Sequence, residues 1–184
     1  PRPSLAREAW MNLNGLWDFQ IVGKGDSAPL VSRGKILVPF PPESALSGVG
    51  HVLQPGQSFV YTREFELPES WAGRRVILHF GAVDWETRVI INNEVQRQHR
   101  HTGGYDPFSF DITSQLRPGS NSIIVIVDDP TDRGGQGRGK QWLSPHGIWY
   151  TPTSGIWQTV WLEPVSDVHI TRVRCEADPA TGAV

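Results

Sequence analysis

Four of the eight tryptophans fall within one stretch, residues 140–163, which reads KQWLSPHGIWYTPTSGIWQTVWLE. From residue 155 onward the side chains alternate between an aliphatic face and a face that carries Trp157 and Trp161. A period of two with β-branched and aromatic residues is typical of a strand, here with both faces packed. The first half contains two prolines and a glycine, which predict an ordered loop. An aromatic loop that leads into a buried strand indicates either core packing or one wall of a site.

The rest of the chain is divided into short segments with a period of two, separated by turns rich in glycine, proline and asparagine. Polar loop residues are expected at 23–34, a hairpin turn at Asn92-Asn93, and at most one helical turn at 113–119. The predicted strands are 16–19, 35–40, 58–67, 74–80, 86–91, 95–100, 108–112, 121–127, 155–163 and 168–174. Many short strands without sustained helical periodicity predict an all-β antiparallel sandwich.

The predicted core consists of large apolar side chains from these strands, each of which stabilises the fold by about 1.5–3 kcal/mol when fully buried. The residues assigned to it are Trp17, Phe59, Tyr61, Phe65, Ile77, Leu78, Val89, Ile91, Phe108, Phe110, Ile124, Ile126, Trp157 and Trp161.

Composition excludes several classes of function. The net charge is −2 and no basic run is present, so nothing favours nucleic-acid binding. No apolar run approaches the roughly 20 residues of a membrane span. The single cysteine, Cys175, excludes an internal disulfide and a multi-cysteine metal site. The first residues lack the pattern of a signal peptide, and the sequence leaves the localisation unknown.

Residues that could carry catalysis are few. Six acids lie at or near strand ends, and two suitably placed carboxyl groups suffice for glycoside hydrolysis, although each acid is equally suited to form a turn. His99 and His101 would share one face of a strand, but no third ligand lies nearby, so no metal site and no cofactor is predicted. The six acids are Asp84, Glu86, Asp106, Asp111, Asp128 and Asp129.

The tryptophan-rich loop has one functional interpretation that suits a sandwich. Sugar rings stack their C–H faces on indole rings, while polar side chains bind the hydroxyl groups. Trp142, Trp149 and Tyr150 are predicted on the loop and are the better candidates for such contacts, whereas Trp17, Trp157 and Trp161 are expected in strands, as part of the core.

Six separated segments resemble, in order, the N-terminal domain of glycoside hydrolase family 2, which includes β-galactosidases, β-glucuronidases and β-mannosidases. They are LNGLWDF (13–19), VPFPPES (38–44), YTREFELP (61–68), ILHFGAVDWETRVIINN (77–93), HTGGYDPFSFDIT (101–113) and TSGIWQTVWLEPV (153–165). The resemblance implies a jelly-roll β-sandwich of galactose-binding-domain type. The parent protein would be a retaining exo-glycosidase, most similar to a β-galactosidase.

The same resemblance implies a domain organisation. Residues 1–164 would form the jelly-roll domain, and residues 165–184 would be a linker and the first strand of a following immunoglobulin-like domain. A TIM barrel with both catalytic glutamates would come next, beyond Val184, so this chain would not be catalytic by itself. The implied partners are a β-glycoside in the parent active site and these two following domains of the same chain.

The resemblance also points to sugar-contacting positions. In related β-galactosidases an Asn before a Pro, upstream of the strand matching residues 58–67, touches the sugar, and Gln54-Pro55 occupies that place here. An Asp shortly before the SGI-type motif also touches sugar in galactosidases and glucuronidases, whereas counting back from Ser154 reaches Trp149 in this chain. The candidate substrate-binding residues are Gln54, Asp129, Lys140, Trp142, Trp149, Tyr150 and Thr151.

Two alternatives remain open from the sequence. The domain could be an autonomous carbohydrate-binding module, since fold alone does not separate the two roles. It could also be a scaffold that only mediates contacts between domains or subunits.

Overall fold

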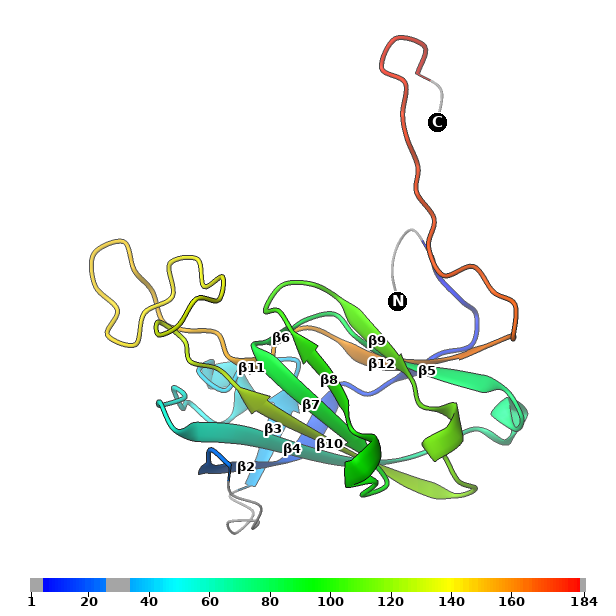
Figure 1. The fold of residues 1–184 in the computed structure, drawn as a ribbon, viewed down its shortest axis with the longest axis horizontal. Coiled ribbons are helices and arrows are strands. Elements are labelled where there is room, and N and C mark those ends of the chain that lie inside the picture. The colour runs from blue at the N-terminus through cyan, green and yellow to red at the C-terminus, as the bar shows by residue number, and fades with distance from the viewer. Residues whose placement is uncertain (1–4, 26–33, 183–184) are drawn as a thin grey trace.

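The computed structural model describes residues 5–25 and 34–182, and shows two antiparallel sheets stacked as a sandwich (Figure 1). The six-stranded sheet has the order β3-β2-β4-β10-β7-β8 and the four-stranded sheet the order β1-β12-β5-β9, while β11 pairs with β6. The strands are Met11–Asn12 (β1), Gly15–Gly23 (β2), Gly34–Val38 (β3), Gln57–Glu66 (β4), Arg75–Phe80 (β5), Val83–Asp84 (β6), Glu86–Ile91 (β7), His99–Thr102 (β8), Phe108–Asp111 (β9), Ser120–Asp128 (β10), Gly155–Ile156 (β11) and Val160–Val165 (β12). The predicted all-β sandwich is confirmed.

Short 3₁₀ turns connect the strands. They are Ala45–Ser47 (η1), Glu69–Trp71 (η2), Val95–Arg97 (η3) and Thr113–Gln115 (η4). The last of these confirms the single helical turn predicted at 113–119. Within residues 5–25 and 34–182, no helix has both the length and the hydropathy needed to cross a membrane.

The hydrophobic core lies between the two large sheets. The six-stranded sheet contributes Trp17, Phe59 and Tyr61, all with 0% exposure, and their rings meet edge to face. The four-stranded sheet contributes Leu78 and Phe80 from the opposite side. Aromatic rings packed edge to face are the favoured geometry, so these contacts stabilise the sandwich beyond their buried area. Predicted core residues that the structure places here are Trp17, Phe59, Tyr61, Phe65, Leu78, Val89 and Ile91, with Phe108 and Phe110 packed partly buried against them.

Three aliphatic core predictions are wrong by one position along a strand. Ile123 and Val125 of β10 point into the core, whereas Ile124 and Ile126 are half-buried on the outer face. Ile77 of β5 likewise faces outward beside His79. These strands are apolar on both faces, so the sequence pattern does not identify the inward one. Ladder pairing decides it, because a shift of one residue moves every side chain to the other face.

Two tryptophans assigned to the core lie elsewhere. Trp161 is buried on the outer face of the four-stranded sheet, where its ring stacks on His79 at 4.8 Å and its Nε1 donates to Glu163. Trp157 is half-buried between β11 and β12, and its Nε1 donates to the carbonyl of Gly104 at 2.8 Å. Both indole N–H groups therefore have acceptors outside the core.

Some local predictions need correction. The strand predicted at 95–100 is wrong in its first half, because residues 95–97 form η3 and β8 begins only at His99. Residues 168–174 form no strand in the structure, and Val168 is 91% exposed, because the described chain offers them no partner strand. Asn92 and Asn93 do form the expected turn, with φ angles of 52° and 61°. Most of the loop predicted at 23–34 lies outside the described residues.

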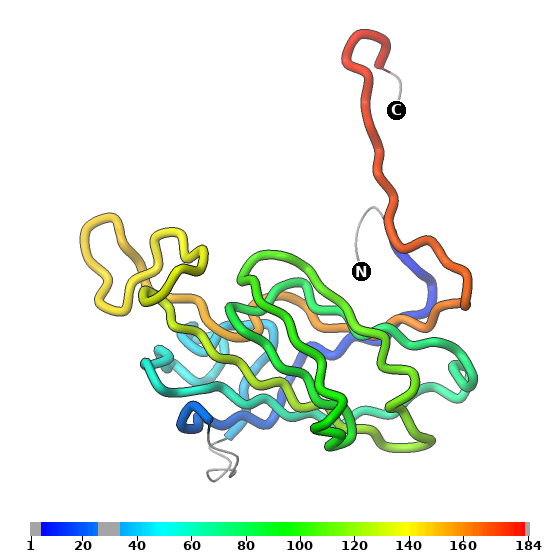
Figure 2. The backbone as a smooth tube through the Cα atoms, viewed as in Figure 1, coloured from blue at the N-terminus to red at the C-terminus, as the bar shows by residue number. Residues whose placement is uncertain are grey.

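The ends of the β4–β10 ladder separate two regions of the surface. Val127 pairs with Phe59 at one end and Ser120 with Glu66 at the other. The turn at Gln54 and the loop of residues 129–154 both adjoin the first end, and the loop projects from the sandwich there (Figure 1). Residues 166–182 leave the body elsewhere as an extended segment beside the N-terminal lead (Figure 2).

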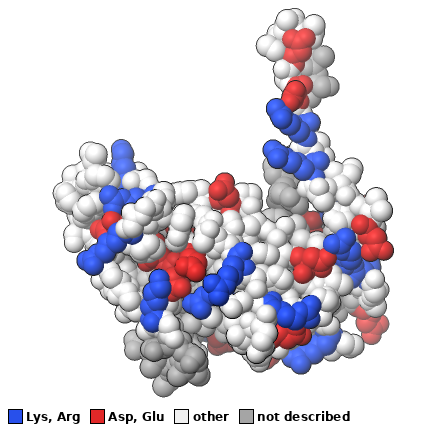
Figure 3. All heavy atoms as spheres, viewed as in Figure 1, with Lys and Arg blue, Asp and Glu red and all other residues white. Residues whose placement is uncertain are grey.

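Charges on the visible face are mixed. Basic and acidic side chains are interspersed over the sandwich, and along the extended segment basic groups near the body are followed by acidic groups toward its end (Figure 3). This distribution agrees with the net charge of −2.

Candidate functional site

The loop of residues 129–154 returns to the sandwich at β11, whose register places Gly155 opposite Asp84 of β6. Gly155 has a φ of +75°, and a Cβ atom at this position would lie 2.0 Å from Tyr61 Oη. Only glycine fits such a close approach at positive φ. The backbone N–H of Ile156 donates to Tyr61 Oη at 3.3 Å, so the end of the loop is fixed directly on the core.

Two acids hold the base of this loop. Ser154 Oγ donates to Asp129 Oδ2 at 2.7 Å, and the N–H of Thr131 donates to Asp129 Oδ1 at 2.7 Å. The N–H of Ser154 donates to Glu43 Oε2 at 3.1 Å. Burial raises the pKa of Asp129. Burial, with a smaller contribution from the charge of Asp129, raises the pKa of Glu43 to about 7. These acids therefore position the loop from beneath.

A third acid, Asp84, is joined to the middle of the loop through Gln141. Gln141 Nε2 donates to Asp84 Oδ2 at 3.2 Å, while Gln141 Oε1 accepts the N–H of Thr153 at 2.5 Å. Asp84 is 3% exposed and Gln141 8%. Burial, and then the charge of Asp129, raise the pKa of Asp84 to about 7, although the bond from Gln141 opposes the shift.

The contact with Asp84 also requires a glycine on the facing segment. A Cβ atom at Gly104 would lie 2.5 Å from Asp84 Oδ1. The neighbouring Gly103 has a φ of +143°, a backbone conformation that favours glycine. The chain therefore passes close to the Asp84 carboxyl group at the point where the Gly104 carbonyl accepts from Trp157.

A pocket of about 380 Å³ lies between this segment and the loop. Asp84 and Gln141 line its buried part, and the rings of Tyr105 and Trp157 meet edge to face along its side, with centroids 6.4 Å apart. Gln141 Nε2 lies 3.4 Å from Tyr105 Oη. The remaining lining comes from the loop and includes Arg138, Lys140, Tyr150, Thr151 and Thr153. Aromatic faces combined with a few fixed polar groups are characteristic of small-molecule sites.

The outer part of the loop carries a second aromatic group. The rings of Trp142 and Trp149 lie 5.3 Å apart at 43°, and the Arg138 guanidinium lies 4.8 Å from the centre of the Trp142 ring. The backbones of Trp142 and Tyr150 are bridged, since the Trp142 N–H donates to the Tyr150 carbonyl at 3.0 Å. Trp142 is half-buried and Trp149 lies beside it, so the pair retains exposed ring surface.

The structure brings most predicted site residues together. Lys140, Tyr150 and Thr151 line the pocket, and Tyr150 is 58% exposed. Gln54 is exposed on a turn at the same end of the sandwich, with its amide donating to the Val52 carbonyl at 3.0 Å. Asp129 is 7% exposed and its carboxylate is occupied by Ser154 and Thr131, as described above.

Sequence reasoning does not assign several residues that line the pocket. Gln141 and Arg138 have no motif to identify them. Asp84 is one of six acids at strand ends, and the strand pattern places Trp157 in the core. Tyr105 follows a pair of glycines, which indicates an unusual turn but not a pocket wall. Contacts between β6 and a loop 57 positions later in the sequence define this pocket.

The two candidate histidine ligands have other partners. His99 stacks on Phe110 with centroids 4.7 Å apart, and its Nε2 lies 2.6 Å from Gln115 Oε1. His101 stacks on Phe108 at 3.9 Å. In the part of the chain that the structure describes, no three residues of the metal-binding types gather as a possible metal site.

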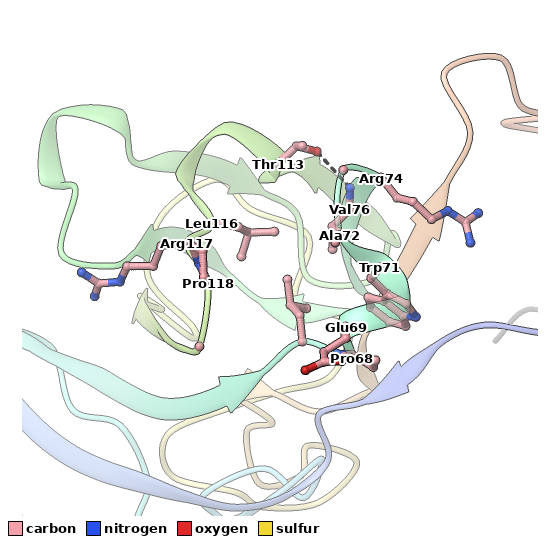
Figure 4. Close-up of a pocket in the computed structure, with 13 residues that line it drawn as sticks. Pro68, Glu69, Trp71, Ala72, Arg74, Val76, Thr113, Leu116, Arg117 and Pro118 are labelled. Atoms are coloured by element: carbon pink, nitrogen blue, oxygen red, sulfur yellow. Dashed lines mark hydrogen bonds between the residues drawn. The ribbon is translucent and has the colours of Figure 1, made fainter.

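A larger pocket, of about 550 Å³, lies at the other end of the β4–β10 ladder (Figure 4). Its labelled residues come from the η2 region, the start of β5 and the η4 region, and include Pro68, Val76, Leu116 and Pro118. Trp71 borders it but is only 6% exposed, so its ring faces are covered and unsuited to stacking a ligand. The smaller pocket under the loop combines open aromatic faces with buried polar groups and is the better candidate site.

The chain is similar in sequence to several glycosidases and matches one family model. The sequence model described as "Glycosyl hydrolases family 2, sugar binding domain" matches residues 49–163. A β-galactosidase of Thermoanaerobacter pseudethanolicus is 33% identical over 128 residues, which cover 67% of this chain and 16% of that protein. A β-glucuronidase of Formosa agariphila is 32% identical over 114 residues, covering 60% of this chain and 11% of that protein. The chain thus spans a small part of these relatives.

Solved structures with the same fold include the β-glucuronidase of an uncultured Clostridium species, with a TM-score of 0.62 and 23% identity over 89% of this chain and 30% of that one. The β-glucuronidase of Bifidobacterium dentium, solved with coumarin-3-O-glucuronide, has a TM-score of 0.62 and 24% identity over 87% of this chain and 31% of that one. At this level of identity the likeness establishes the fold.

Proposed function

The chain belongs to the sugar binding domain family of glycosyl hydrolases family 2, and on this premise we propose that its loop-bearing edge forms one wall of the active site of a larger retaining glycosidase. The observation that carries the proposal is the aromatic and polar edge formed by Trp142, Trp149 and the pocket below them. Indole faces stack on sugar rings, while fixed amide and carboxyl groups bind hydroxyls.

Each candidate residue has a place in this proposal. Trp142, Trp149 and Tyr150 supply the stacking surface, Lys140 and Thr151 supply polar contacts at the pocket, and Gln54 reaches the sugar from the neighbouring turn. Asp129 supports the loop from its base, because both of its carboxylate oxygens are bonded to loop residues.

We propose a β-galactosidase-like activity for the parent protein. The relatives reported above include β-galactosidases and β-glucuronidases that are much longer than this chain. The catalytic pair of carboxyl groups that retention requires would come from another domain, so the 184-residue chain alone should not hydrolyse nitrophenyl β-glycosides.

We also propose that residues 165–184 lead into the next domain, with Val165 still forming the last residue of β12 in the sandwich. Residues 168–174 alternate like a strand but have no partner strand among the described residues, with Ile170 61% and Val173 44% exposed. A strand of a following immunoglobulin-like domain would supply the missing ladder and cover these side chains.

The test is hydrolysis by the longer enzyme that carries this domain. Trp142→Ala and Trp149→Ala should each lower kcat/KM about tenfold, because loss of one stacking contact costs about 1.5 kcal/mol. Trp10→Ala is the matched control, since Trp10 is 40% exposed and lies outside the loop. Equal kinetics for all three variants would overturn the proposal and favour a scaffold role.

A second role, that of an autonomous binding module, is favoured by the exposure of Tyr150 at the pocket. It is tested by titrating the isolated chain with galactose, glucose, mannose and glucuronate while its amide NMR signals are followed. Saturable shifts of the signals from Gln54 and residues 140–151 would support the binding-module role. Unchanged amide signals with all four sugars would refute it.

A further inference from the structure

The pocket under the loop ends at a carboxyl group with few hydrogen-bond donors. Among the described residues, Asp84 receives one hydrogen bond, from Gln141 Nε2 to Oδ2. None of the ion pairs found in residues 5–25 and 34–182 includes Asp84. A carboxylate that is 3% exposed normally accepts several donors or pairs with a cation. The free acceptor capacity lies beside the pocket.

The charged groups around the pocket do not neutralise Asp84. Arg138 donates to the carbonyl of Asp132 and stacks on Trp142, so it is engaged with its own loop. Lys140 is exposed at the pocket lining. Asp129 adds a like charge at the base of the loop. A ligand that donates hydrogen bonds would therefore be favoured at Asp84, whereas a ligand carboxylate there would be repelled.

The shape and chemistry of the pocket restrict such a ligand further. Trp157 is held by its bond to the Gly104 carbonyl, and Tyr105 packs against its edge, so the two rings form a rigid apolar side. Tyr105 Oη, which accepts from Gln141, keeps its own proton to donate. A pyranose ring has an apolar C–H face that can stack on these aromatic rings and hydroxyl groups that can donate to the carboxylate. The pocket volume of about 380 Å³ is large enough for one such ring.

We propose that this pocket holds one pyranose ring, which stacks against Trp157 and donates two neighbouring hydroxyl groups to Asp84. Gln141 positions the Asp84 carboxyl group, and Tyr105 contacts the same ring. The inference rests on the proposed function, because it adds a specific subsite to the carbohydrate-binding edge. In the wall proposed above, Trp142 and Trp149 stack on the sugar. In this subsite, Asp84 of β6 binds the hydroxyl groups of the sugar.

The subsite has a consequence for the pH dependence of binding. Hydroxyl donors stabilise the ionised form of Asp84, whose pKa is raised to about 7 in the free chain. Ligand binding must therefore release the proton, and affinity should increase as pH rises through 7. If only the ionised form binds, the affinity should be about tenfold higher at pH 8 than at pH 6.

The experiment is an NMR titration of the ¹⁵N-labelled 184-residue chain with neutral probes, which are methyl β-D-galactopyranoside, methyl β-D-glucopyranoside and methyl β-D-mannopyranoside. The indole N–H of Trp157 and the side-chain amide of Gln141 report on the subsite. Kd is measured at pH 6 and pH 8 for the natural chain and for Asp84→Asn. The control is Asp128→Asn, which removes an acid that is 4% exposed and does not line the pocket.

We expect saturable shifts at Trp157 and Gln141, and a tenfold pH effect that is lost in Asp84→Asn and kept in Asp128→Asn. Tyr105→Phe provides a second variant, at a residue that is 52% exposed, and it should weaken binding severalfold while keeping the pH effect. Shifts confined to Trp142, Trp149 and Gln54 without a pH effect would overturn the subsite and leave the proposed function intact. No shift with any probe would also overturn it.

Discussion

Replacing Asp84 by asparagine should remove a large pH-dependent contribution to the stability of this domain. Asp84 is 3% exposed, and burial, followed by repulsion from Asp129, raises its pKa from 3.8 to about 7. The folded chain therefore keeps a proton on Asp84 that the unfolded chain releases. The stabilisation is complete below pH 4 and is lost as pH rises to 7.

The size of this stability change follows from the shift in the pKa of Asp84. A difference of about 3 pH units corresponds to roughly 4 kcal/mol as an upper value, at about 1.4 kcal/mol per unit. Asparagine keeps the shape of the side chain and has no charge, so it does not incur this loss. The free energy of unfolding of Asp84→Asn, measured relative to the natural chain, should therefore rise by a few kcal/mol between pH 4.5 and pH 7.5.

Urea unfolding followed by tryptophan fluorescence measures this difference at pH 4.5, 5.5, 6.5 and 7.5. Other groups titrate in this window, including Glu43 and His101, and burial lowers the pKa of His101 and so acts in the opposite direction. Subtracting the free energy of unfolding of the natural chain from that of Asp84→Asn at each pH removes most of the contribution of Glu43 and His101. A difference that stays constant across the window, or that falls as pH rises, would refute the reasoning.

Two further predictions concern the core and the base of the loop. Trp17→Ala should lower the free energy of unfolding by about 3–5 kcal/mol, because Trp17 is fully buried. Trp157→Ala should lower it by about half as much, because Trp157 is half-buried at the pocket. Urea unfolding measures both losses, and equal losses would contradict this placement of the two side chains. Gly155→Ala should lower Tm, because the new Cβ atom would lie 2.0 Å from Tyr61 Oη and the residue has a positive φ. Adding Tyr61→Phe should restore part of the lost Tm, since it removes the hydroxyl group but not the backbone strain. If calorimetry shows no recovery of Tm in the double variant, the clash with Tyr61 Oη is not the cause.

The sequence alone determined the fold class, the approximate position of most strands and the family. These features depend on local patterns, such as the alternation of residues 58–67 and the two asparagines that adopt positive φ in the β7–η3 turn. The family resemblance rests on segments spread over most of the chain, and the match to residues 49–163 confirms it. The tryptophan-rich stretch of residues 140–163 is also recognisable as a candidate site, because it holds four of the eight tryptophans and its first half contains turn-forming proline and glycine.

The tertiary structure decided which faces are inside and which residues share the pocket. In β10 both faces are apolar, so only pairing with β4 and β7 directs Ile123 inward and Ile124 outward. Asp84 meets Gln141 across 57 positions of sequence, a contact that no local periodicity encodes. Residues 168–174 have the pattern of a strand but form none, because a strand requires a partner and pattern alone does not supply one. Local backbone conformation depends on residues that are neighbours in the sequence. Burial and hydrogen bonding depend instead on contacts with segments that are distant in the sequence.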